Sequence, residues 1–277
     1  MEWLIDKTSN LPKLSLLFIG TLFFCQFGNL NAAEPVSANK SLQAWQNPHY
    51  ILKAFNEIAL KNEYRQSSKR VVKWHQPIRY QFHHLKLKPN ALVEQLFTTH
   101  LQHLASITGL EIQPTNKSNA NLNIYLTQDK NYANAIKKYT GSKVKNIERD
   151  SHCMGSYTTN KQHEITRANI IIPVDHVFSR GLLVACVVEE TTQVLGLPND
   201  ASWVNPSIAN DDSKIELLTG LDYIMLKILY STQLKAGMTT KESRPVIQEE
   251  ITKLINQDEV QNAATKVNSQ GLYQLVN

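Results

Sequence analysis

The pattern of apolar and polar positions predicts helices interspersed with short strands along most of this chain. Apolar residues recur three or four positions apart, as on a helix face, over residues 48–61, 90–109, 131–139, 219–230 and 243–257. Alternating or short continuous apolar runs predict strands at residues 77–83, 110–112, 122–126 and 168–174. This order indicates the α+β class, in which helices pack on a small twisted sheet.

Two of the predicted helices carry clear start signals. Asn90 and Thr219 are residue types that cap helix N-termini, and Asp222 follows Thr219 at the spacing of a capping box. His100 and His103 share one face of the helix that starts at Asn90. Such a pair could bind a metal ion, but we expect a solvated surface. The same helix places four leucines at predicted core positions, namely Leu92, Leu96, Leu101 and Leu104.

The most apolar stretch of the sequence predicts a buried strand followed by a long buried helix. Residues 168–174 read A-N-I-I-I-P-V, and the helix is predicted over residues 175–195. This helix is apolar almost all round between residues 182 and 188, so it must be buried. Gly196 is expected to end it as a C′ residue. Its C-terminal end therefore carries several polar side chains, which are Glu189, Glu190 and Gln193.

The first 33 residues have the features of an export signal. Two lysines precede an apolar run over residues 14–27, and Asn31-Ala32-Ala33 supplies small residues for cleavage. A membrane anchor is the alternative, but the run is short for a bilayer and is interrupted by Gly20 and Gln26. We therefore expect an exported protein, periplasmic or extracellular, with no transmembrane anchor in the mature chain.

Residues 34–277 are enough for one large domain with its own core. Within this domain, residues 34–47 are polar and expected to be flexible, and residues 243–277 are expected to form a C-terminal helix and tail. The formal net charge of +5 is spread along the chain, which argues against a dedicated nucleic-acid binder. The sequence also contains no P-loop and no dinucleotide-binding glycine motif.

The cysteines fit an oxidising compartment. Cys25 lies inside the export signal, so only Cys153 and Cys186 remain in the mature chain. Two cysteines in an exported protein are expected to form a disulfide, and the alternative is two buried thiols. In the chain-entropy model, closing the loop between them would stabilise the fold by roughly 3–4 kcal/mol.

Residues 186–200, C-V-V-E-E-T-T-Q-V-L-G-L-P-N-D, keep the spacing of a zinc-protease motif without its metal ligands. The long metzincin motif is H-E-x-x-H-x-x-G-x-x-H. In register with it, Glu190 takes the position of the catalytic glutamate and Gly196 that of the turn glycine. The three histidine positions are filled by other residues, with Asp200 directly after the last, namely Glu189, Gln193 and Asn199.

This spacing predicts a convergent polar site, because residues i and i+4 lie on one helix face and the glycine lets the chain return. The donors are carboxylate and amide oxygens, whereas zinc sites use His or Cys. We expect no zinc and no cofactor, although a hard divalent cation such as calcium would suit these donors. Glu189 and Glu190 also require a cation, a shared proton or a nearby Lys or Arg to offset their repulsion.

Three functions are compatible with this motif. A binding or scaffold protein is favoured, because losing three histidines removes the Lewis acid that activates water. The alternative is a hydrolase with Glu190 as general base, Glu189 as partner acid, and Gln193 and Asn199 as amide donors to an oxyanion. In the third case the two glutamates belong to a structural domain without a ligand.

The motif also resembles a known family. The pattern C-x-x-E-E-x-x-Q-x-L-G-L-x-N-D, followed by P-S-I at 206–208 and L-T-x-x-D at 218–222, is similar to domain of unknown function 2927, an uncharacterised family of exported bacterial proteins. The sequences L-K-I-L-Y at 226–230 and K-A-G-M at 235–238 extend the resemblance, which covers roughly residues 153–238.

That family itself resembles metzincins that lack the zinc-binding histidines. Ser207-Ile208 lies about where metzincins place their Met-turn, although the methionine is absent. The resemblance implies a zincin-like fold and supplies no activity. We therefore predict a degenerate metallopeptidase-like protein with a non-proteolytic binding or scaffold role in the cell envelope. Its expected partner is an envelope protein or a peptide.

Few residues outside the motif are candidates for a site. All nine histidines lie at or before His176, and only His152 and His176 are placed to approach the motif in three dimensions. Trp74 and Trp203 are expected to be core or rim residues.

Overall fold

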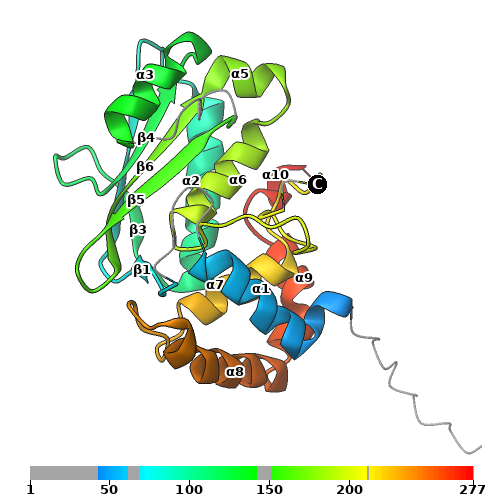
Figure 1. Cartoon of the computed structure of the whole chain (residues 1–277). Helices are drawn as coiled ribbons and strands as arrows, with labels where there is room; N and C mark the ends of the chain where they lie inside the picture. The colour runs from blue at the N-terminus through cyan, green and yellow to red at the C-terminus, as the bar shows by residue number, and fades with distance from the viewer. Residues whose placement is uncertain (1–42, 62–68, 142–150, 211, 277) are drawn as a thin grey trace, which may run out of the picture. The chain divides into compact units, whose positions relative to one another are not determined.

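The computed structural model of the chain describes residues 43–61, 69–141, 151–210 and 212–276 (Figure 1). All of these belong to the unit Ser41–Asn277. The expected export signal at residues 1–33 lies outside the described residues, as do residues 34–42 of the segment expected to be flexible. Among the described residues, no helix is both long enough and apolar enough to cross a membrane.

The strands form one six-stranded sheet in the order β1-β6-β4-β2-β3 with parallel pairing, and β5 runs antiparallel along β6. Their bounds are β1 Lys73–Trp74, β2 Ile78–His84, β3 Ile112–Pro114, β4 Leu122–Thr127, β5 Met154–Thr159 and β6 Glu164–Pro173. The predicted α+β class is confirmed. β2, β4 and β6 match predicted strands, and β3 begins two residues later than predicted.

The helices follow in the order η1 Ala44–Gln46 (a 3-10 helix), α1 Pro48–Leu60, α2 Ala91–Thr108, α3 Asp129–Tyr139, α5 Val174–Ser179, α6 Leu183–Gln193, α7 Gly220–Leu229, α8 Thr240–Asn256, α9 Glu259–Asn268 and α10 Tyr273–Val276. The two predicted caps are confirmed. Asn90 accepts hydrogen bonds from the first turn of α2, and Thr219 forms a capping box with Asp222 at the start of α7.

Side chains alternate across the two faces of the sheet, which divides the apolar residues into two clusters. Ile124, Ile170 and Ile172 belong to the main core, together with apolar residues of α2 and α6. Ile171 faces the other way and packs with Met154 and with residues of α3. Figure 1 shows α2 and α6 running beside the sheet, so α6 is held between the core and the strand β5.

The single helix predicted over residues 175–195 is wrong, because the segment forms α5 and α6 with a break between them. Gly181 has a φ of +71°, a left-handed conformation that glycine adopts at little cost. The N–H of Leu182 then donates to the carbonyl oxygen of Val177 at 2.8 Å and turns the chain. Both helices face the core, so the apolar pattern continued through the break and concealed it.

Three further expectations differ from the structure. Residues 44–46 are helical and Trp45 is buried, because it packs into the core, so this part of the segment is not flexible. The expected C-terminal tail forms α9 and α10, with Val260, Ala263 and Val267 buried. Leu92 is half exposed because it faces away from the core, whereas Val93 in the same first turn of α2 is fully buried.

His100 and His103 were expected on a solvated surface, and this is wrong, since both are buried. His100 lies against Val188 of α6, and His103 lies against Gly271 between α9 and α10. Burial, together with the like charge of His103, lowers the pKa of His100 from 6.5 to about 3. Burial lowers the pKa of His103 to about 4. The unfolded chain therefore binds more protons than the folded chain below pH 6.5, so the fold loses stability as the pH falls.

We expect the substitution His100→Gln to weaken this acid sensitivity. At pH 5 the buried neutral imidazole lowers the free energy of unfolding by about 2 kcal/mol relative to pH 8. Urea denaturation measures the free energy of unfolding at pH 5 and at pH 8. The change between the two pH values should be about 2 kcal/mol smaller in the variant than in the wild type. The matched control is His49→Gln on the exposed start of α1, and an equal pH difference in both variants would contradict the prediction.

Candidate functional site

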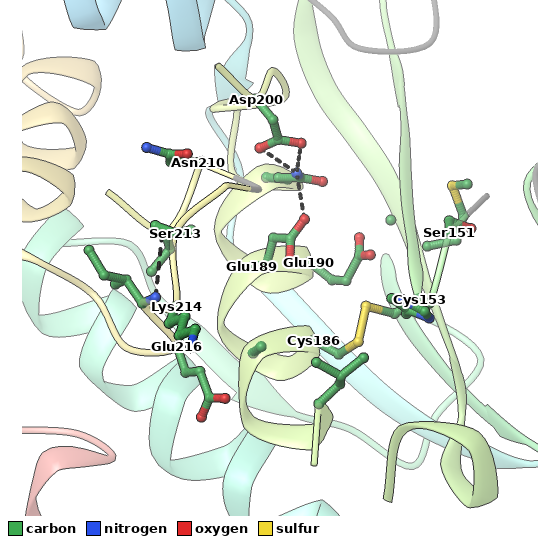
Figure 2. A pocket seen from close by; sticks show the side chains of 18 residues that line it. Ser151, Cys153, Cys186, Glu189, Glu190, Asp200, Asn210, Ser213, Lys214 and Glu216 are labelled. Atoms are coloured by element: carbon green, nitrogen blue, oxygen red, sulfur yellow. Dashed lines mark hydrogen bonds between the residues drawn. A yellow bond between two sulfur atoms is a disulfide. The ribbon is translucent and has the colours of Figure 1, made fainter. Parts of the chain in front are cut away.

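A pocket of about 570 Å³ lies between α6, the start of β5 and the chain that follows Gly196 (Figure 2). One wall is the polar side of α6, and the facing wall is the segment that leads into β5. The third side comes from residues 200–210 and 213–216. Its charged lining residues are predominantly acidic, with Lys214 beside four carboxylates, namely Glu189, Glu190, Asp200 and Glu216.

One amide nitrogen joins two of these carboxylates. Gln193 Nε2 lies 3.3 Å from Glu189 Oε1, one turn earlier on α6. The same nitrogen lies 3.2 and 3.0 Å from the two carboxylate oxygens of Asp200. The predicted i, i+4 convergence of Glu189 and Gln193 is thus present, and the returning chain supplies the third group (Figure 2).

The return depends on Gly196. Its φ is +112°, and a Cβ atom at this position would lie 2.2 Å from the carbonyl oxygen of Val72. Two side chains fix the turn by donating to its carbonyls, Trp74 Nε1 to Val194 at 2.9 Å and Tyr230 Oη to Leu195 at 2.7 Å. α6 ends at Gln193, so Gly196 is the turn residue and not the helix C′ residue that was expected.

Asp200, and not Asn199, completes the polar group in the pocket. Asn199 is buried, and its Nδ2 donates to the backbone oxygen of Asp200 at 2.9 Å. Its own N–H donates to Ile58 O at 3.2 Å. Asn199 therefore fixes the backbone that presents Asp200, whereas the sequence motif suggested a direct role for Asn199.

Glu189 and Glu190 are consecutive residues of α6, so their side chains point in different directions around the helix. Figure 2 shows the Glu189 carboxylate directed toward the Gln193 and Asp200 side, and the Glu190 carboxylate toward β5. Glu190 is 4% exposed although it lines the pocket. A Cβ atom on Gly155 of β5 would lie 2.5 Å from Glu190 Oε2, so a larger residue there would displace this carboxylate.

The predicted disulfide between Cys153 and Cys186 is present, with an S–S distance of 2.03 Å. Cys186 lies one turn before Glu189 and Glu190 on α6, and Cys153 directly precedes β5. Both cysteines line the pocket. The disulfide therefore joins the two facing walls of the pocket one helical turn from Glu189 and Glu190 (Figure 2).

The buried carboxylate of Asp222 holds the chain segment that forms the third side of the pocket. Asp222 accepts hydrogen bonds from Ser207 Oγ at 2.5 Å and from Ile208 N at 3.2 Å. It also accepts from Thr219 N at 2.8 Å and Thr219 Oγ1 at 2.9 Å. Burial raises the pKa of Asp222 against the opposing effect of these hydrogen bonds. Ile208, held by this network, lines the pocket.

Comparison with protein families finds that residues 48–249 match the family described as "Protein of unknown function (DUF2927)". The chain belongs to the DUF2927 family. The match runs from the first residue of α1 into α8, far beyond residues 153–238, where the sequence motifs alone located the resemblance. It includes every element of the DUF2927 pocket. No curated protein matches the chain.

The structure of this DUF2927 chain brings one further residue to the pocket that no local motif indicated, and pairs it with a histidine of α5. His152 lines the pocket, and its Nδ1 lies 2.9 Å from His176 Nε2 on α5. His176 Nδ1 in turn lies 3.5 Å from Asp129 Oδ1 on α3. Within the described ranges, no group of three or more His, Cys, Asp or Glu side chains has the arrangement of a metal site.

Proposed function

We propose that this DUF2927 protein is a non-proteolytic binding protein of the cell envelope that holds an extended polypeptide beside β5, in a zincin-like fold. Residues 1–33 would direct export, and residues 34–277 would form the single binding domain. The expected partner is an envelope protein or a peptide. The observation that carries this proposal is the contact of Gln193 with Glu189 and Asp200.

At the position of the second zinc-binding histidine, this chain directs an amide N–H toward two carboxylates. Gln193 Nε2 is a hydrogen-bond donor and cannot coordinate a cation through that atom. Its contacts with Glu189 and Asp200 favour a fixed arrangement of acceptors over a zinc centre. Carboxylates held in this way suit a ligand that brings N–H groups or a basic side chain.

The edge of the sheet supports a polypeptide as that ligand. Among the described strands, β5 pairs only with β6, so its other edge has no strand beside it. An edge strand offers a row of backbone N–H and C=O groups to which an extended segment can add. The first residues of β5, Met154 and Gly155, line the pocket, so an added segment would place side chains near the acidic group.

The hydrolase reading is the second candidate. Glu190 is buried and lines the pocket at the position of the metzincin general base. In this reading it activates water, with Glu189 as partner acid and Gln193 supplying an amide donor to the oxyanion. Glu189 and Asp200 would also provide oxygen ligands if a hard cation such as calcium occupied the pocket.

The proposal is tested on the untagged chain after export. Binding of arrayed extended peptides, measured by fluorescence polarisation, should favour peptides with Lys or Arg. We expect Glu189→Gln and Asp200→Asn each to weaken that binding about tenfold, equivalent to about 1.4 kcal/mol. Glu249→Gln on the exposed face of α8 is the matched control and should bind as wild type does.

The same preparation separates the alternatives. Peptide hydrolysis that disappears in Glu190→Gln would establish the hydrolase and contradict a purely binding role. Zinc found in a stoichiometric amount by mass spectrometry would also contradict the proposal. A thermal shift with calcium that is lost in Glu189→Gln and Asp200→Asn would establish the cation reading instead.

A further inference from the structure

Two histidines join the pocket wall to α5. The ring nitrogens His152 Nδ1 and His176 Nε2 lie 2.9 Å apart, and the two rings stack with centroids 5.2 Å apart. His152 directly precedes Cys153, which the disulfide fixes to α6. The imidazole contact therefore links the outermost part of this wall to α5, and the contact of Ser151 Oγ with Tyr132 Oη at 3.1 Å links it to α3.

This contact depends on protonation. A hydrogen bond between two ring nitrogens needs one N–H and one lone pair, so the pair can hold at most one extra proton. Asp129 Oδ1 lies 3.5 Å from His176 Nδ1, on the side of the ring away from His152. Once both rings are protonated, both facing nitrogens carry hydrogen. The hydrogen bond is then lost, and two like charges face each other.

The surroundings of His152 oppose a proton on its ring. Partial burial lowers the pKa of His152, and the positive charges of His176 and Arg180 lower it further. Asp175 accepts a hydrogen bond from the N–H of Asp129 and so keeps the start of α3 beside α5. Other charged groups of the elements around the pair are Lys130, Lys137 and Lys138 on α3, and among the pocket residues Glu189, Glu190, Lys214 and Glu216.

We propose that His152 and His176 form a pH-sensitive clasp that holds the outer wall of the pocket at neutral pH and releases it on acidification. The disulfide limits the movement, because Cys153 stays bound to α6 while residues 151–152 separate from α5. The clasp would regulate access of the polypeptide to β5, and in that respect it rests on the proposed function.

Hydrogen exchange of the whole protein at pH 7 and pH 5, corrected for the chemical exchange rate, tests the clasp directly. Residues 151–156 and α5 should lose protection about fivefold at pH 5, the factor that corresponds to about 1 kcal/mol of lost hydrogen bonding. β4 should keep its protection. In His176→Asn the second charge cannot form, so the loss at pH 5 should disappear, whereas the exposed control His49→Asn should behave as wild type.

An NMR titration of the imidazoles gives a second measurement that does not depend on exchange. The midpoint of His152 should rise in His176→Asn, because a neighbouring positive charge is removed. Unchanged protection at pH 5 in the wild type, an equal loss in His176→Asn, or an equal loss in β4 would each overturn the clasp.

Peptide binding at the two pH values separates this inference from the proposed function. If no peptide binds at either pH while the local loss of protection persists, the clasp stands and the proposed function fails. If peptides bind equally at both values and protection does not change, the clasp fails and the binding function stands.

Discussion

Replacing Asp222 with alanine is expected to lower the free energy of unfolding by about 4 kcal/mol, because four hydrogen bonds to one buried carboxylate are lost together. Asp222 is 1% exposed, so water cannot replace these bonds in the folded protein. The donors left behind include the backbone N–H groups of Ile208 and Thr219, and a buried donor without a partner is destabilising.

The chain contains a matched control for this substitution. Thr239 and Glu242 form the same capping box at the start of α8, but on the surface. Glu242→Ala should therefore have a much smaller effect in urea denaturation at pH 7. Equal losses in the two variants would show that the contacts with Ser207 and Ile208 add nothing beyond the capping box.

Asp222→Ala should also disturb the pocket, since Ile208 lines it and depends on Asp222 for its position. Thr219 Oγ1 also lies 2.9 Å from the carbonyl oxygen of Pro206 and shares its one proton between this oxygen and Asp222, so the 206–208 segment rests on the start of α7. We expect weaker peptide binding in this variant at temperatures where it remains folded. Glu242→Ala should leave binding unchanged.

Removing the disulfide with the double substitution Cys153→Ala and Cys186→Ala should lower the free energy of unfolding by roughly 3–4 kcal/mol. The bond lies between residues that are 33 positions apart, so its loss frees a long loop in the unfolded chain. It also joins the start of β5 to α6, so its loss removes the link between the two walls of the pocket.

Urea denaturation of the oxidised wild type, the reduced wild type and the double variant measures this effect. The reduced protein and the variant should agree with each other, and both should be less stable than the oxidised protein. Identical stability of all three would show that the bond contributes nothing to the fold. Cys153→Ala alone is an unsuitable control, since it leaves Cys186 as a free thiol.

Much of the fold was predictable because its signals are local. The N-caps at Asn90 and Thr219 use side chains that reach only a few residues along the chain, and the central strands β4 and β6 contain short stretches rich in apolar residues. β5 was missed because its sequence, M-G-S-Y-T-T, has neither an apolar run nor a clear alternation. β5 is a strand because it pairs with β6, and its own residues give no strand pattern.

The burial of the two histidines of α2 could not be predicted from the sequence. His100 and His103 are polar residues on one helix face, and nothing in their sequence spacing tells whether that face meets water or another helix. The packing of α6, and of the chain around Gly271, on α2 decided it. The same packing between distant segments brings His152 to His176, a contact that no sequence spacing encodes.

The sequence by itself determined the α+β class, the membership of its motif in a family, the disulfide pair, and the helix, glycine turn and return around residues 189–200. These features follow from short-range spacing, residue type and the number of cysteines. Only the tertiary structure decided that Asp200 faces Gln193 while Asn199 supports it, and that Glu190 lies against Gly155 of β5. Those outcomes depend on how separate segments approach one another, because the direction of a side chain is fixed by the surfaces packed around it.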